Sequence, residues 1–299
     1  MPRPKGSERG TCRSLTAHTD SMLEDLDLTK SISKTAAAPR LKALQSRLRL
    51  LQYAVQEANV PLIICLEGWN ACGRGEVFKK LSELLDPRLY QVNRGRPPSP
   101  LELRYHFLWR YQLALPRKGE MVIFDHSWYA RVLEDRCDRL IKKKLWRQAY
   151  SQINEFERWL VDDGTVLIKF WLHISRKEQG RRLRAYRKDP LLRWKVTKAY
   201  WRQHKHYNRW LKAAEEMLAR CGTAYAPWTL IEAEDPQWAR IRALETVVSR
   251  MEGALQFQLP DLKPGRKEPR AAESRNERRS KKPAAKPVAE AAKEADAGV

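Results

Sequence analysis

The sequence is poor in the features that mark secreted and membrane proteins. Its 299 residues include only 5 cysteines, which are scattered and form no C-x-x-C pair, so neither a disulfide framework nor a zinc site is expected. No apolar run approaches the roughly 18 residues that a membrane-spanning helix needs. The first 15 residues are basic and polar and carry no apolar signal core. We therefore expect a cytoplasmic protein with no membrane partner.

Acidic residues are also scarce. The chain has 36 Asp and Glu against 58 Lys and Arg, a formal net charge of +22. Most of the excess lies in residues 41–259, which carry +16, while the two ends carry the rest. A body this basic indicates a polyanionic partner, and on charge alone both inorganic polyphosphate and nucleic acid qualify.

Apolar patterning predicts strands that alternate with helices. Apolar runs predict strands at 61–66, 121–124 and 166–172, and two further short strands are predicted at 90–93 and 229–232. Helical spacing predicts helices at 43–58, 77–85, 128–140, 145–160, 176–187, 198–219 and 237–251, and a Ser99–Glu102 capping box predicts one more, through residue 111. This alternation indicates an α/β fold with a parallel sheet and right-handed crossovers.

The two ends of the chain differ from this middle region. Residues 1–40 lack periodicity and are predicted to be mostly disordered, with room for a short docking segment. Residues 260–299 are rich in Pro, Ala, Lys and Glu, which predicts a disordered basic tail. The folded domain is therefore expected to span residues 41–259.

A glycine-framed loop follows the first predicted strand. Gly68 and Gly73 are separated by four residues, as in the phosphate-loop pattern G-x-x-x-x-G-K-[ST], and a helix follows. Backbone N–H groups in such a loop form an anion cradle. Phosphate or nucleotide binding is therefore predicted for Gly68, Asn70, Ala71, Cys72, Gly73 and Gly75. Arg74 stands where the pattern has lysine, and a plain strand–turn–helix connection is the alternative interpretation.

An acidic residue and several cations complete the candidate site. Asp125 ends the strand at 121–124, the layout of a Walker B carboxylate that organises magnesium, although a helix-capping Asp would look the same. The predicted phosphate-binding cations are Arg94, Arg131 and, in a basic segment at 176–195, Arg182, Arg187 and Lys195. A solvated basic face is the alternative for that segment, but its acidic partners are few.

The order of these motifs resembles the second family of polyphosphate kinases, and most closely its polyphosphate:AMP phosphotransferase branch. The resemblance covers about residues 41–252 and is carried by EGWNACGRG (67–75), HFLWR (106–110), FDHSWYAR (124–131), INEFE (153–157), KFWLHIS (169–175), DPLLRWK (189–195) and YAPW (225–228). It implies a three-layer, thymidylate-kinase-like phosphate-loop fold with a helical lid at about 131–200. It also implies magnesium-dependent phosphoryl transfer between polyphosphate and a nucleotide of the AMP, ADP or GDP class, by a homo-oligomer. In this scheme Asp125 is the metal ligand, and Arg74, Arg131 and Asp125 are the catalytic set.

The chain departs from the family pattern at several of these positions. The family's loop aspartate is Asn70 here, its loop lysine is Arg74, and the arginine after the Walker B aspartate is His126. In the lid, Tyr186 replaces an arginine and Tyr200 an acidic residue. Asn binds magnesium less tightly than Asp, Arg is bulkier than Lys, and His126 is expected to be largely neutral near pH 7 and so a weaker phosphate ligand.

These departures keep two other functions open. One is a catalytically weakened or inactive relative that binds polyphosphate or nucleotide as a regulatory or partner protein. The other, less favoured, is a nucleic-acid-binding role of the basic surface. The missing loop carboxylate and lysine favour the first alternative, whereas retention of Asp125 and Arg131 favours an active phosphotransferase.

Overall fold

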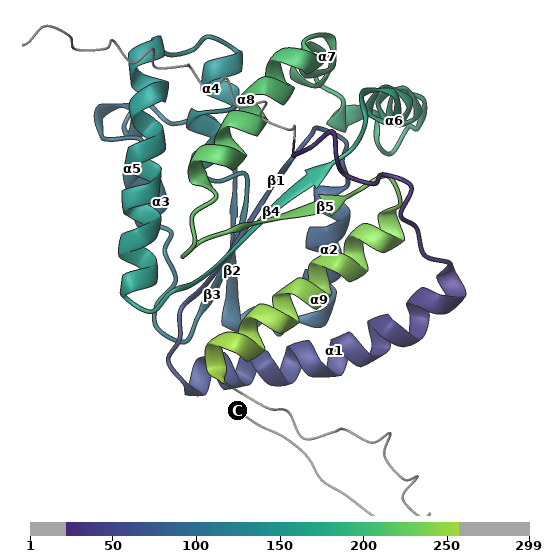
Figure 1. The fold of residues 1–299 in the computed structure, drawn as a ribbon, viewed down its shortest axis with the longest axis vertical. Helices are drawn as coiled ribbons and strands as arrows, with labels where there is room; N and C mark the ends of the chain where they lie inside the picture. Colours follow the sequence, from purple (N-terminus) through teal and green to yellow (C-terminus); the bar gives the residue numbers. More distant parts are fainter. Residues whose placement is uncertain (1–21, 257–299) are drawn as a thin grey trace, which may run out of the picture. The chain divides into compact units, whose positions relative to one another are not determined.

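The described residues, 22–256 in this computed structural model, build an α/β fold around a parallel sheet (Figure 1). The strands are β1 (Leu62–Gly68), β2 (Tyr90–Arg94), β3 (Met121–Asp125), β4 (Val166–His173) and β5 (Trp228–Glu232). They lie in the order β2-β3-β1-β4-β5, and every pair is parallel. All five strands agree with the predicted positions to within two residues. Strands β1, β3 and β4 are buried along nearly their whole length, as continuous apolar runs predict, whereas β2 is exposed or half-buried.

The register brings the predicted site residues to one edge of the sheet. Asp125 at the end of β3 lies beside Leu66 of β1 and Arg94 of β2, and Gly68 lies beside Leu172 of β4. The carboxyl ends of parallel strands are where open α/β sheets bind their ligands. The fold thus gathers the glycine loop, Asp125 and Arg94 at the same edge.

Helices cover both faces of the sheet, which gives three layers (Figure 1). On one face lie α1 (Lys34–Glu57), α2 (Arg74–Leu84) and α9 (Pro236–Leu255), and on the other lie α3 (Trp109–Gln112), α5 (Lys143–Asp162) and α8 (Tyr207–Cys221). Above the carboxyl ends of the strands stand α6 (Arg176–Lys188) and α7 (Lys198–Lys205), joined by a short 3-10 turn, η4 (Arg193–Lys195). We call this segment, residues 176–205, the lid; it begins later than the lid predicted at about 131–200, because α5 and β4 belong to the layers of the fold. None of the helices in residues 22–256 has the length and apolar composition that crossing a membrane requires.

Three predicted helices are shorter or broken. The capping box forms, with Ser99 N donating to Glu102 Oε2 (2.7 Å) and Glu102 N donating to Ser99 Oγ (3.2 Å). It opens only η2 (Glu102–Arg104), however, and α3 follows separately. The 128–140 prediction resolves into η3 (Trp128–Arg131) and α4 (Glu134–Cys137), and the 198–219 helix breaks at His206 into α7 and α8. Near the site, tertiary contacts outweigh helical periodicity. The remaining turn, η1 (Pro87–Leu89), precedes β2.

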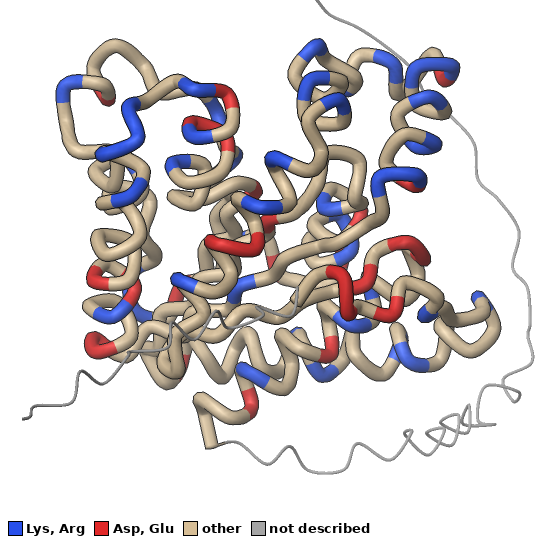
Figure 2. The backbone as a smooth tube through the Cα atoms, turned by 45° about the horizontal axis from the view of Figure 1, so that its top comes forward, with Lys and Arg blue, Asp and Glu red and all other residues tan. Residues whose placement is uncertain are grey.

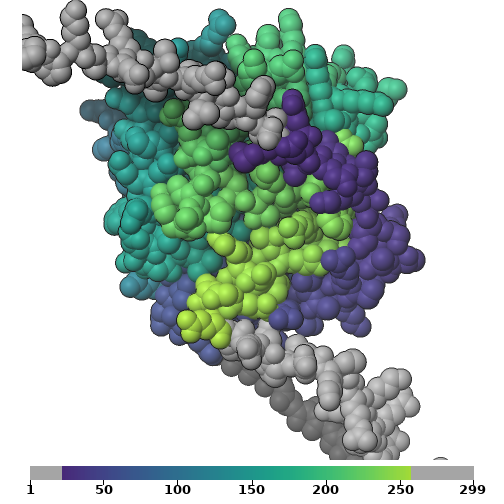
Figure 3. Space-filling view, in the orientation of Figure 1, coloured from purple at the N-terminus to yellow at the C-terminus, as the bar shows by residue number. Residues whose placement is uncertain are grey.

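Regular structure begins before the predicted domain boundary at residue 41. Ser33 caps α1 by accepting from Ala36 N. The helix therefore begins at Lys34 and includes residues 34–40, whose sequence shows no apolar periodicity. The segment before it, residues 22–33, lies across the surface next to later parts of the chain (Figure 3). Leu23 is buried and its N–H donates to Glu215 of α8 (3.0 Å), while Lys30 pairs with Glu232 of β5 (2.8 Å). The disorder predicted for residues 1–21 and 260–299 concerns segments outside the described residues.

Candidate active site

The glycine loop connects β1 to α2 at the carboxyl edge of the sheet. Gly68 has φ 149°, and a Cβ there would lie 2.5 Å from the Leu172 carbonyl oxygen, so no larger residue fits. Gly73, with φ 99°, turns the chain into the first turn of α2. The loop therefore has the strand–turn–helix context that the phosphate-loop prediction requires.

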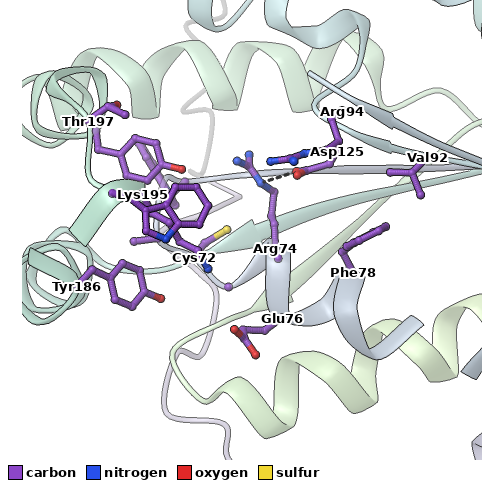
Figure 4. Close-up of a pocket in the computed structure, with 16 residues that line it drawn as sticks. Cys72, Arg74, Glu76, Phe78, Val92, Arg94, Asp125, Tyr186, Lys195 and Thr197 are labelled. Carbon is purple, nitrogen blue, oxygen red and sulfur yellow. Dashed lines mark ion pairs between the residues drawn. The ribbon is translucent and has the colours of Figure 1, made fainter. Parts of the chain in front are cut away.

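Arg74 lies at the centre of the site, buried at the start of α2. Its Nη1 donates to the Gly68 carbonyl oxygen (3.1 Å), its Nε lies 3.5 Å from Asp125 Oδ1, and its Nη2 lies 2.5 Å from His126 Nε2. Figure 4 shows the side chain directed at Asp125. Burial opposes the charge of Arg74, but the negative charge of Asp125 holds its pKa above the usual value. One guanidinium thus joins the loop to the end of β3 through Gly68, Asp125 and His126. A lysine ammonium is a point charge and could not reach all three.

His126 lies between Arg74 and two carboxylates. Its Nδ1 is 3.4 Å from Glu134 Oε1 and 3.6 Å from Glu67 Oε2. Burial and the charge of Arg74 act against protonation, but hydrogen bonds with Glu134 and Glu67 outweigh them and raise the pKa of His126 to about 9. The short contact with Arg74 favours a singly protonated ring, because a guanidinium only donates. The two carboxylates favour the protonated ring and the Arg74 contact favours the neutral one, so the charge of His126 at pH 7 stays a prediction.

Two buried polar atoms next to the glycine loop lack hydrogen-bond partners. They are Arg74 Nε and Asp125 Oδ1, which face each other at 3.5 Å. Among the described residues no group of three or more His, Cys, Asp and Glu could hold a metal ion. Mg²⁺, however, usually binds through one or two carboxylates, with phosphates and waters completing its shell. Asp125 Oδ1, which accepts no hydrogen bond and is paired only with the Arg74 charge, fits that role as a single protein ligand.

A cavity of about 550 Å³ opens over the loop. Its floor is the loop and the start of α2, its side is Arg94 with Asp125, and its roof is the lid (Figure 4). Lid residues that line it include Tyr186, Trp194, Lys195, Thr197 and Tyr200. Of the predicted site residues, Ala71, Cys72, Gly73, Arg74, Gly75, Arg94, Asp125 and Lys195 line this cavity.

Asn70, Arg182 and Arg187 are placed differently from the other predicted residues. Asn70 does not line the cavity: its N–H donates to Gln203 Oε1 of α7 (2.8 Å), and its carbonyl oxygen accepts from Gln179 Nε2 of α6 (3.3 Å). Arg182 is buried and donates to the carbonyl oxygens of Ala71 (3.1 Å), Ala233 (2.8 Å) and Glu234 (2.8 Å). It holds the loop's backbone rather than facing the cavity, which differs from its predicted role in binding polyphosphate. Arg187 is exposed on α6, outside the cavity lining.

A second cavity, of about 430 Å³, lies on the other side of His126. Aromatic side chains line one part of it: Tyr105, Phe107, Tyr111 and Trp128. Charged side chains line the rest: Arg96, Glu102, Arg110, His126, Arg131, Glu134 and Asp135. Arg131 Nη1 donates to Asp135 (3.1 Å), while its buried Nε has no hydrogen-bond partner. The two cavities have no lining residue in common, and the Arg74–His126 contact joins them.

The sequence interpretation missed several residues that shape the site. Glu67 lies under the loop, where its Oε1 accepts from Ser127 N (2.7 Å) and Ser127 Oγ (2.8 Å). The available signal was an acid inside an apolar strand. Gln203 and Glu134 carry no such signal, because both lie in polar segments. Gln203 reaches the loop from α7, which ends at the break at His206, and Glu134 reaches His126 from the short α4.

Comparison with known proteins explains this arrangement. Residues 31–258 match the sequence profile of the family described as Polyphosphate kinase 2. The chain belongs to the polyphosphate kinase 2 family. Its parallel sheet, glycine loop and flanking helices are the phosphate-loop kinase fold of that family, as predicted.

Individual relatives agree with this assignment. The chain is 36% identical over 234 residues to a Polyphosphate:AMP phosphotransferase of Pseudomonas syringae pv. tomato, an alignment that covers 78% of this chain and 47% of the relative. It is 33% identical over 230 residues to an AMP/ADP-polyphosphate phosphotransferase of Meiothermus ruber, covering 76% and 86%. The crystal structure of Polyphosphate Kinase 2 from Arthrobacter aurescens TC1 superposes with a TM-score of 0.76 at 26% identity, covering 81% of this chain and 88% of that one. The chain thus spans about half the length of the Pseudomonas syringae relative.

Proposed function

We propose that this chain transfers phosphoryl groups between inorganic polyphosphate and a nucleoside mono- or diphosphate. The observation that carries the proposal is the pair of cavities that meet at the Arg74–His126 contact. Transfer requires a donor and an acceptor phosphate in line at one point, and two cavities that share one boundary suit that requirement. The names of the relatives support both substrate classes.

In this proposal the larger cavity binds the polyphosphate chain. The glycine loop and the cations Arg74, Arg94 and Lys195 line it, and Arg187 extends the positive charge along α6. Fixed positive charges neutralise the oxygens of a transferring phosphoryl group at no cost of reorganisation.

The smaller cavity is the proposed nucleotide site. Its aromatic side chains suit a nucleobase, and Arg131 and His126 suit the acceptor phosphate. A nucleotide of the AMP, ADP or GDP class fits this combination of an apolar wall and paired cations.

The proposed metal is magnesium, with Asp125 as its protein ligand. When bound, it supplies charge neutralisation to the phosphate oxygens. Asn70 contributes through its backbone, which the lid holds in place. A cytoplasmic location and a homo-oligomeric state, which the composition and the resemblance predict, belong to the same proposal.

A phosphoryl-transfer assay tests the function. Purified full-length protein is incubated with polyphosphate, Mg²⁺ and a panel of AMP, ADP, GMP and GDP. We expect transfer to at least one nucleotide, its loss in Asp125→Asn, and its retention in the control Asp163→Asn, which changes an exposed carboxylate at the end of α5. Polyphosphate binding without transfer to any nucleotide would contradict the proposal and favour the alternative of a binding protein.

A further inference from the structure

A fully buried ion pair is connected to the second cavity through Trp128 and takes no part in the proposed chemistry. Lys169 of β4 and Glu157 of α5 meet at 2.7 Å, and both side chains are 0% exposed. Replacing such a pair by apolar side chains of similar size often leaves stability unchanged or raises it. Stability alone is therefore a poor reason for these charges to be here.

Every polar hydrogen of the Lys169 ammonium is used. Nζ donates to Glu157 Oε2 (2.7 Å), to the Cys221 carbonyl oxygen at the end of α8 (2.7 Å) and to the Tyr129 hydroxyl (3.0 Å). The Tyr129 hydroxyl in turn donates to Glu157 Oε1, which also accepts from Trp128 Nε1 (2.9 Å). The hydrogen bonds thus have one consistent direction, which fixes two aromatic side chains in position.

Both of these aromatic residues belong to η3, the turn between His126 and Arg131. Trp128 lines the second cavity, and Arg131 ends the turn with its guanidinium over the Phe107 ring at 5.2 Å. The start of the turn is held separately, since Ser127 donates twice to Glu67. Two buried carboxylates, one on β1 and one on α5, therefore anchor the segment that carries His126 and Arg131.

We infer that Lys169 and Glu157 are positioning residues for the second cavity: through Trp128 and Tyr129 they hold η3 so that His126 and Arg131 face a bound nucleotide. The inference rests on the proposed function for the identity of the ligand. The ordering of η3 itself does not depend on it.

The test uses two variants of the full-length chain. The double variant Lys169→Met/Glu157→Gln removes both charges together and keeps a carbonyl oxygen for Trp128. Tyr129→Phe removes only the hydroxyl that joins the two charges. We expect the apparent KM for the nucleotide to rise about tenfold in the double variant and by a smaller factor in Tyr129→Phe. In both variants KM for polyphosphate should stay within about twofold of the wild-type value.

A second measurement reads the turn directly. Hydrogen exchange of the amides of residues 127–133 is expected to accelerate about tenfold relative to those of β1, because the backbone bonds from Val132 N and Leu133 N to the Tyr129 carbonyl oxygen (both 3.0 Å) open more often. This measurement needs no catalytic turnover, so it still tests the inference if the wild-type chain transfers no phosphate and the proposed function fails.

Gln52→Leu is the matched control. Gln52 of α1 is also buried, and its side-chain amide exchanges two hydrogen bonds with the backbone of Asp86, which precedes β2. It should lower the unfolding temperature without changing nucleotide KM or exchange in residues 127–133. The inference is overturned if the double variant behaves like this control, or if both test variants show wild-type exchange in η3.

Discussion

At the scale of single residues, Arg74 makes the contacts on which the site depends most. It bridges the Gly68 carbonyl oxygen, Asp125 and His126. Arg74→Ala should reduce transfer by about 10³-fold or more, the range found when an arginine that stabilises a transferring phosphoryl group is lost. Arg74→Lys should retain part of the activity, because a point charge keeps the pairing with Asp125 but cannot also reach His126. Steady-state kinetics with saturating polyphosphate measure both effects.

The control for this experiment is Arg117→Ala, which removes an exposed positive charge before β3. Its kinetics should match those of the wild-type chain. Equal losses in Arg117→Ala and Arg74→Ala would show that total charge, rather than the contacts of Arg74, matters.

A second residue-scale prediction concerns His173 at the end of β4. It is buried, and its Nδ1 accepts from Trp69 Nε1 of the loop (3.1 Å), which requires a neutral ring. Burial lowers the pKa of His173 to about 4. In the unfolded chain the pKa is about 6.5, so stability is fully present above pH 6.5 and falls as the pH drops towards 4.

Chemical unfolding at pH 7 and pH 5 measures this effect in the wild-type chain and in His173→Gln, whose amide oxygen can still accept from Trp69. The wild-type chain should lose about 2 kcal/mol more than the variant between the two pH values. Only the difference between the wild-type chain and His173→Gln isolates His173. The raised pKa of His126 makes the stability of both proteins fall as the pH rises, which is the opposite direction. Identical losses would mean that His173 is protonated in the folded protein.

At the scale of elements, the lid and the glycine loop are joined by side-chain amides. Gln203 Oε1 of α7 accepts from Asn70 N (2.8 Å) and from Gln179 Nε2 of α6 (2.8 Å). Gln203→Leu leaves the Asn70 N–H without its acceptor and leaves Gln179 Nε2 with only the Asn70 carbonyl oxygen, so it should lower the free energy of unfolding by about 1–3 kcal/mol. Exchange of the Asn70 amide should accelerate at the same time.

Gln203→Glu serves as the control, since it keeps an acceptor oxygen for the same two donors. It should retain the slow exchange of the Asn70 amide. If Gln203→Leu has wild-type stability and wild-type exchange, the lid does not hold the loop through this contact.

The elements also show how far the sequence could predict the structure. The buried strands β1, β3 and β4 follow from apolar runs, and the placement of Gly68, Asp125 and Arg94 at one edge follows from the rules for parallel sheets. The breaks at 104–109 and at His206 could not be predicted, because η2, α3 and α7 are shaped by contacts distant in the sequence. The role of Arg182 was hidden for the same reason: its partners Ala71 and Ala233 lie more than a hundred residues before it and about fifty after it along the chain.

At the scale of the whole molecule, positive charge is concentrated in the folded part. Figure 2 shows Lys and Arg along the lid helices, and α6 alone has seven basic residues among thirteen, with the sequence RKEQGRRLRAYRK. Because residues 41–259 carry +16 of the net +22, a chain that ends at residue 259 should bind polyphosphate within about threefold of the full chain. Affinity should fall in both as salt rises from 50 to 500 mM, since screening weakens exposed charge pairs.

Calorimetric titration of polyphosphate of fixed length into the two proteins checks this prediction. Loss of binding in the shorter chain would place the polyanion site on the last forty residues. Affinity independent of salt would argue against an electrostatic site altogether.

Two cavities with no lining residue in common also have a consequence for the order of events in turnover. Under the proposed assignment of polyphosphate to one cavity and nucleotide to the other, both substrates can be bound at once and in either sequence. Initial-rate plots at several fixed concentrations of the second substrate should therefore intersect, rather than run parallel as they would for a phosphorylated enzyme intermediate. A long polymer can stay in its own cavity while successive nucleotides enter and leave the other, and several transfers can then follow a single encounter with the chain.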